Sequence, residues 1–163
     1  MDLFHYISRY FWGVCLVVAL INFVSADKRI GSSDVDDKDR ADIARRYLRR
    51  FSVAGAIPWL IMGWGQVVGN VPTVWYYFRP QDENPYVIAW LGSIFLLSLL
   101  YAVWIFFADG ARKIHEYELF ATVGMRNIKS MPRFLIKLLA AFGPVFVGIW
   151  VYLTASMNVS IPQ

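Results

Sequence analysis

The polar side chains best placed to bind a ligand in this 163-residue chain lie inside an apolar stretch, at Gln66 and Asn70. Gly63, Gln66 and Asn70 recur at helical intervals, and Gly65 and Gly69 form a GxxxG pair on an overlapping face. Small residues let a second helix backbone approach closely, and the two amides can then hydrogen-bond across the contact. These five residues predict a helix-packing surface. The alternative is a pocket for a quinone, a lipid headgroup or a haem.

Haem ligation and covalent catalysis need residue sets that this sequence does not bring together. Its two histidines, His5 and His115, are expected at opposite faces of a membrane, where they cannot share one iron. Cys15 is a single thiol in an apolar run, where cysteine usually acts as a small hydrophobic residue. No Ser, Cys, His and acid constellation provides a nucleophile with a base. We expect no catalytic residue and no cofactor bound by this chain alone, although a haem with one ligand from a partner stays open.

The acidic run Asp34, Asp36, Asp37 and Asp39 raises the question of a calcium site. Counted from Asp34, Asp39 stands where an EF-hand loop needs glycine, and Arg45 stands where the loop needs a bidentate glutamate. We therefore predict no metal site here. Carboxylates in a first helical turn favour the positive end of the helix dipole, so the run predicts the start of a short amphipathic helix before the second apolar stretch.

Four arginines, Arg45, Arg46, Arg49 and Arg50, follow in that amphipathic segment and lie next to the predicted membrane surface. Each can bind an anionic lipid headgroup with about 1 kcal/mol of favourable free energy. The simpler interpretation is that they only fix the orientation of the chain in the membrane.

The composition explains why a membrane must position these residues. Apolar residues make up 58% of the chain and charged residues only 17%, whereas soluble domains are about half apolar and about a quarter charged. Because the charges are sparse and lie between apolar runs, the chain is neither mainly disordered nor mainly a nucleic-acid-binding protein, and a single cysteine excludes a disulfide scaffold. We predict an all-α integral membrane protein, a four-transmembrane-helix bundle in which residues 1–163 form a single membrane domain.

Four apolar stretches predict the spans, because each is long enough to cross a hydrocarbon core roughly 30 Å thick. They cover about residues 4–26, 51–72, 86–108 and 134–156. A signal peptide processed near residues 24–26 is the rival interpretation of the first stretch, but its leading segment has no net positive charge, which favours an anchor. The sequence leaves open whether the second stretch is one helix or is broken between Gly69 and Pro72.

The positions of lysine and arginine predict the orientation, since these residues accumulate on the cytoplasmic side. Segment 26–50 holds eight of them and segment 109–137 holds six, against two, Arg9 and Arg79, elsewhere. Loops 27–50 and 109–133 are therefore expected in the cytoplasm, and both termini and loop 73–85 are expected outside. The predicted location is the cell (inner) membrane, with several passes.

Many contact residues and no catalytic ones indicate a non-catalytic integral membrane subunit that packs with itself or with other membrane subunits and stabilises a larger complex. Its expected partners are membrane lipids, anionic lipids included, and other membrane proteins, but no nucleic acid. The alternative is a small membrane redox or transport component with a quinone, lipid or haem pocket near Gln66 and Asn70. No ionisable residue lies in the middle of a span, which disfavours ion-coupled transport.

Overall fold

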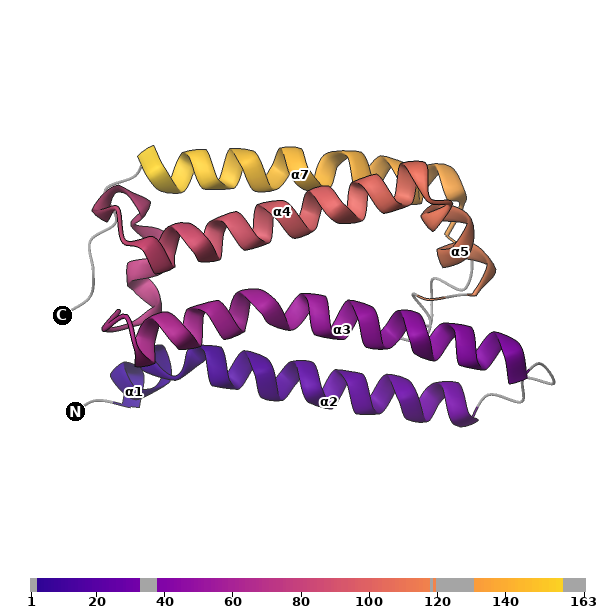
Figure 1. The fold of residues 1–163 in the computed structure, drawn as a ribbon, viewed down its shortest axis with the longest axis horizontal. Helices are drawn as coiled ribbons and strands as arrows, with labels where there is room; N and C mark the ends of the chain where they lie inside the picture. Colours follow the sequence, from indigo (N-terminus) through magenta and orange to yellow (C-terminus); the bar gives the residue numbers. More distant parts are fainter. Residues whose placement is uncertain (1–2, 33–37, 118, 120–130, 157–163) are drawn as a thin grey trace.

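The computed structural model describes residues 3–32, 38–117, 119 and 131–156, and this part of the chain is helical apart from short connections (Figure 1). The helices are α1 (Leu3–Arg9), α2 (Phe11–Ser32), α3 (Lys38–Val67), α4 (Pro85–Phe107), α5 (Gly110–Glu116) and α7 (Arg133–Ser156). Two 3-10 helices, η1 (Val74–Phe78) and η2 (Pro80–Asp82), connect α3 to α4. The first predicted span is thus two helices, and its break at residue 10 leaves Arg9 at the end of α1 instead of inside α2.

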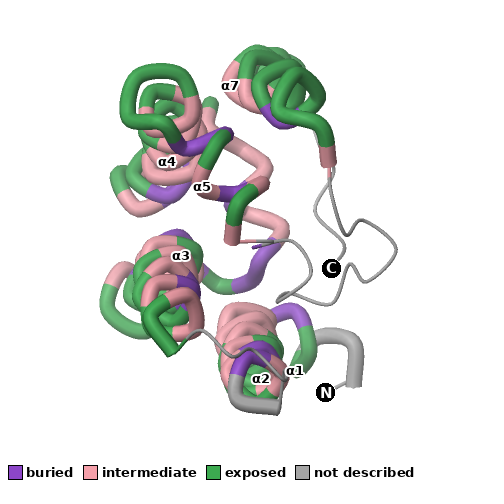
Figure 2. Tube along the Cα trace, turned by 90° about the vertical axis from the view of Figure 1, so that its right-hand side faces the viewer, coloured by how far each residue is buried: buried purple, intermediate pink, exposed green. Residues whose placement is uncertain are grey.

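The four long helices lie side by side, and α1 and the last turns of α7 lie at the end of the molecule opposite α5 (Figure 1). In the described residues, α3 packs against α2 and α4, and α7 packs against α4. The end-on view shows the resulting order, in which α2 and α7 are the two outer helices of a curved layer (Figure 2).

Among the described residues, three helices are long and apolar enough to cross a membrane: Phe11–Ile30 of α2, Pro85–Phe107 of α4 and Arg133–Ser156 of α7. The prediction of four spans is thus supported for three helices. The second predicted span does not reach this standard because it shares α3 with the charged amphipathic segment, and α3 ends at Val67 instead of continuing to residue 72. The amphipathic helix predicted before span two is therefore the first half of one continuous helix. Residues 34–37, predicted to cap it, lie outside the described residues.

Buried side chains concentrate in two clusters, one toward each end of the helical layer. The cluster near α5 joins α2, α3, α5 and α7 through residues such as Ala26, Leu48, Ile114 and Ile136. The cluster at the other end joins the last turns of α3 to η1 and α4. The helices also expose large apolar side chains, including Phe107 at 84% and Phe146 at 72%. Apolar surface this extensive is typical of contact with lipid or another protein.

Candidate functional site

The three glycines predicted to pack against another helix lie against aromatic rings from α2 and α4. A β-carbon on Gly63 would lie 2.7 Å from the ring of Trp12, and one on Gly65 would lie 2.8 Å from Cβ of Tyr86. A β-carbon on Gly69 would come closer than 3.0 Å to the Tyr86 ring. Glycine is therefore required at these positions so that rings from α2 and α4 can reach the α3 backbone.

Tyr77 of η1 fixes the same end of α3 by a hydrogen bond. Its hydroxyl donates to the backbone carbonyl oxygen of Met62 over 2.8 Å, and the residue is 0% exposed. Burial raises the pKa of Tyr77 well above its usual value, and the nearby Tyr86 acts in the same direction. The hydroxyl therefore stays protonated and remains a donor near neutral pH. The sequence gives one indication of this contact, the run of aromatic residues at 75–78, which the prediction did not use.

Gln66 is buried beside this contact, with 8% of its surface exposed. Neither its Nε2 nor its Oε1 atom has a hydrogen-bond partner in the described part of the chain. Thr73 Oγ1 and Trp90 Nε1 are also buried without a partner there, and the Trp90 ring contacts Tyr77 at a centroid distance of 5.4 Å. A buried amide without a partner costs about 1–3 kcal/mol, so this end of the molecule has unused capacity to bind a polar group.

Asn70 ends α3 through its backbone conformation. Its φ of 53° lies in the left-handed region, which asparagine tolerates better than most residues. The Val71 N–H then donates to the Gly65 carbonyl oxygen over 3.0 Å, which closes the helix end. The second apolar stretch is therefore helical to Val67 and turns at Asn70, as the alternative of a break near Gly69 to Pro72 anticipated.

Asn70 lines a cavity beside the end of α3. The cavity has a volume of about 330 Å³ and is also lined by Val71, Pro72, Tyr76, Asp82, Asn84 and Val87, and Gln66 is not among these residues. Two of the polar groups in this cavity already have partners. Asp82 pairs with Arg79 over 3.1 Å, and the Asn84 side chain accepts a hydrogen bond from the Tyr86 N–H over 3.0 Å at the start of α4.

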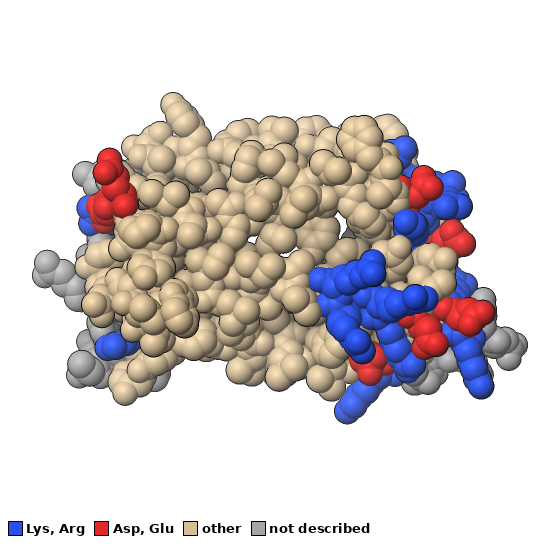
Figure 3. Space-filling view, viewed as in Figure 1, with Lys and Arg blue, Asp and Glu red and all other residues tan. Residues whose placement is uncertain are grey.

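The predicted lipid-binding arginines lie on α3, at the basic end of the molecule, where blue surface gathers in Figure 3. All four, Arg45, Arg46, Arg49 and Arg50, are exposed. Arg45 forms an ion pair with Asp42 of the same helix at 3.6 Å and one with Asp27 at 3.2 Å, and the second pair attaches α3 to α2. The other three have no carboxylate within 4 Å among the residues that the structure describes.

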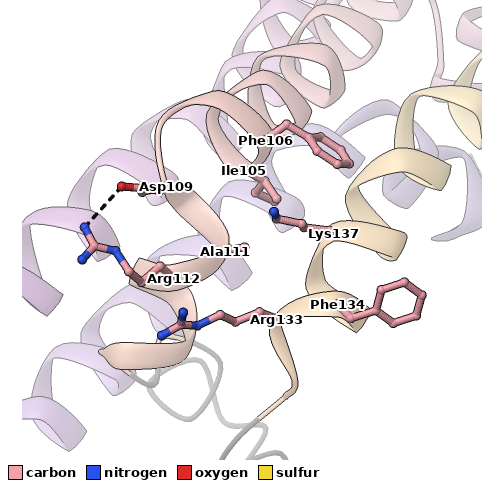
Figure 4. Close-up of a pocket in the computed structure, with 8 residues that line it drawn as sticks. All are labelled: Ile105, Phe106, Asp109, Ala111, Arg112, Arg133, Phe134 and Lys137. Carbon is pink, nitrogen blue, oxygen red and sulfur yellow. Dashed lines mark hydrogen bonds and ion pairs between the residues drawn. The ribbon is translucent and has the colours of Figure 1, made fainter.

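A second basic site, which the sequence analysis did not identify, lies where α4, α5 and α7 meet. Its cavity of about 380 Å³ is lined by Ile105, Phe106, Asp109, Ala111, Arg112, Arg133, Phe134 and Lys137 (Figure 4). Arg112 pairs with Asp109 over 3.3 Å. From the sequence, these cations indicate only the orientation of the chain in the membrane. Residues 112 and 133 lie on different helices, so their spacing along the chain does not predict that they share a site.

The helices that carry the two histidines lie at opposite ends of the molecule, α1 with His5 and α5 with His115 (Figure 1). Within this chain the two residues therefore cannot ligate one iron. The His115 ring is 3.1 Å, measured from Nδ1, from the carbonyl oxygen of Met131. Over the described residues, no group of three or more His, Cys, Asp or Glu side chains is placed to hold a metal ion.

The chain matches no protein-family model, and comparisons with curated proteins and with solved structures find no similar protein. Its function must therefore be inferred from its own residues and geometry.

Proposed function

We propose that this chain is a non-catalytic, multi-pass subunit of the cell (inner) membrane, which packs with a second copy or with other membrane subunits and stabilises a larger complex. Four spans are part of this proposal, with α3 as the fourth. Support for α3 comes from its position between α2 and α4, two helices that are long and apolar enough to cross a membrane. If its neighbours cross the bilayer, the apolar half of α3 crosses beside them.

The proposed orientation follows from the basic end of the molecule. α5 belongs to one predicted cytoplasmic segment and the basic first half of α3 to the other, and both lie at the end of the molecule opposite α1 and the last turns of α7 (Figure 1). Lysine and arginine near span ends favour the cytoplasmic side, so we place the α5 end inside and the termini outside.

The observation that carries the packing proposal is the contrast between two groups of glycines. Aromatic rings of this chain occupy the space beside Gly63 and Gly65, whereas Gly55 on α3 and Gly92 on α4 are exposed. Nothing in the described residues lies within 4 Å of a β-carbon built on Gly55 or Gly92. In a membrane, exposed small residues permit close approach of another helix, so these two open positions are suited to contact with a second polypeptide.

Mild-detergent purification followed by cross-linking and mass spectrometry tests this proposal. Gly55→Leu and Gly92→Leu should reduce the recovered complex, because a bulky side chain prevents close approach. Val53→Leu and Val103→Leu are the controls, since they add bulk at exposed positions of α3 and α4 that are already large. A folded monomer without any associated chain, or equal losses in both pairs of variants, would contradict the proposal.

A second candidate is a small membrane redox or transport component that binds a quinone, lipid or haem near Gln66 and Asn70. The buried and unpartnered amide of Gln66 favours it. An absorption spectrum of the purified protein detects haem, and lipid extraction followed by mass spectrometry detects a quinone. Gln66→Leu with Asn70→Leu should then remove the ligand and spare assembly. Loss of assembly without loss of a ligand would support the packing role.

A further inference from the structure

The basic cavity between α4, α5 and α7 brings three cationic side chains together from two helices. Arg133 and Lys137 extend from the first turns of α7 toward α4 and α5, and Arg112 comes from α5 (Figure 4). Asp109 is the one carboxylate among the lining residues, so the cavity carries three positive charges against one negative charge. The net formal charge of its lining is therefore +2.

The charges of α7 are not compensated within the described protein. Asp109 is paired with Arg112, and no described carboxylate lies within 4 Å of Arg133 or Lys137. These two residues are four positions apart on α7 and share a face, where like charges repel each other. An anion between the side chains would relieve this repulsion, and guanidinium and ammonium groups are the usual partners of phosphate.

The apolar part of the cavity identifies what carries the anion. Phe106 of α4 is 43% exposed and Phe134 of α7 is 75% exposed. In Figure 4 both rings point away from the cationic ends of Arg112, Arg133 and Lys137. The cavity also lies where two candidate spans end, at Phe107 of α4 and Arg133 of α7. A charged group with apolar surface directly beside it matches a lipid headgroup and its acyl chains, whereas a free phosphate would use only the cations.

We propose that the cavity lined by Arg112, Arg133 and Lys137 binds the phosphate group of an anionic membrane lipid, with the acyl chains lying against Phe106 and Phe134. This inference depends on the membrane location proposed above, and it places a specific lipid site away from the arginines of α3. Arg133 and Lys137 hold the phosphate, while Arg112 is kept at the edge of the cavity by Asp109. Inorganic phosphate shares the headgroup chemistry, so the test must separate these two sources.

The test is a titration of the full chain, purified in mild detergent and stripped of lipid, with short-chain phosphatidylglycerol and followed by native mass spectrometry. Parallel titrations use phosphatidylcholine of the same chain length and inorganic phosphate. Removing both cations in Arg133→Gln with Lys137→Gln should weaken phosphatidylglycerol binding about 30-fold, at about fivefold per cation. The control, Lys28→Gln with Lys38→Gln, removes the same charge from exposed positions on α2 and α3 and should leave tight binding intact.

Two further variants keep the interpretation unambiguous. Arg133→Lys with Lys137→Arg preserves the charge and should retain binding, which separates loss of the site from loss of the fold. Phe134→Ser should weaken phosphatidylglycerol binding and leave any inorganic phosphate binding unchanged. Equal losses in the cavity variant and in the Lys28→Gln with Lys38→Gln control would overturn the proposal in favour of general surface charge. Binding of inorganic phosphate as tight as that of phosphatidylglycerol would overturn the lipid assignment.

The same samples separate this inference from the proposed function. If the cavity variant loses lipid but keeps its associated chains, both proposals stand as independent properties. Unchanged lipid binding in the cavity variant refutes the lipid site alone. A monomeric wild-type protein that binds phosphatidylglycerol refutes the packing role alone.

Discussion

Tyr86 packs so closely on Gly65 that a β-carbon on the glycine would lie 2.8 Å from Cβ of the tyrosine. The first turn of α4 thereby contacts the α3 backbone directly, and the hydroxyl of Tyr77 fills the same space from η1. No outward movement of one ring can accommodate a larger residue at this point, because two side chains converge on it.

We expect Gly65→Ala to lower the free energy of unfolding by about 1–3 kcal/mol, since an added methyl group overpacks this contact. The matched control is Gly55→Ala in the same helix, where the described residues leave open space. Alanine is favoured over glycine in a helix interior, so this control should raise stability by about 1 kcal/mol. Thermal unfolding of both variants in detergent measures the difference, and effects of the same sign would contradict the packing described here.

Tyr77→Phe tests the hydrogen bond between the hydroxyl and the Met62 carbonyl, which are 2.8 Å apart. Phenylalanine keeps the ring and its contact with Trp90, so the loss is confined to the hydroxyl. We expect a destabilisation of about 1 kcal/mol, typical of one neutral hydrogen bond. Chemical denaturation in a fixed detergent provides the measurement, with Tyr6→Phe at an exposed position as the control.

The same tyrosine should make the protein sensitive to alkali. Burial raises the pKa of Tyr77, so the folded protein keeps this proton at pH values where the unfolded chain loses it. The folded state then binds more protons than the unfolded state, and the free energy of unfolding falls as pH rises above about 10. Below that pH the group has no effect. Unfolding temperatures measured across this range should fall more steeply for wild type than for Tyr77→Phe, and parallel curves would refute the assignment.

The sequence predicts a span at 86–108, and α4 covers Pro85–Phe107, because the uncharged apolar run sets the length of this helix. It does not predict where α3 ends. That end depends on the left-handed conformation of Asn70 and on aromatic residues that come later in the chain. Hydrophobic periodicity contains no information about either feature.

The candidate sites show the same division between local and long-range information. Gly63 and Gly65 of α3 lie at close contacts, but their partners, Trp12 and Tyr86, follow from the tertiary structure alone. The cavity cations on α5 and α7 are brought together by the packing of both helices against α4. Spacing along the sequence cannot reveal a site whose members lie on separate helices.

Gln66→Leu tests whether the buried amide serves the fold. Because neither polar atom of Gln66 has a partner among the described residues, leucine removes a desolvation cost of about 1–3 kcal/mol. We expect the unfolding temperature to rise in the purified, ligand-free protein. A lower unfolding temperature of the variant would show that the amide has a partner. A rise in the unfolding temperature of the wild type on adding a quinone would favour the binding role of Gln66.

Asn84→Ala tests the residue that starts α4. Its side-chain oxygen accepts a hydrogen bond from the Tyr86 N–H over 3.0 Å, which satisfies one of the free donors in the first turn. Alanine removes this acceptor, and we expect a loss of about 1 kcal/mol in the free energy of unfolding. Asn84→Asp keeps an acceptor and should retain most of the stability. Because Tyr86 also covers Gly65, the alanine variant should expose the end of α3 to faster amide hydrogen exchange. Unchanged hydrogen exchange at residues 62–66 would show that the Tyr86 ring stays in place without the hydrogen bond from the Asn84 side chain.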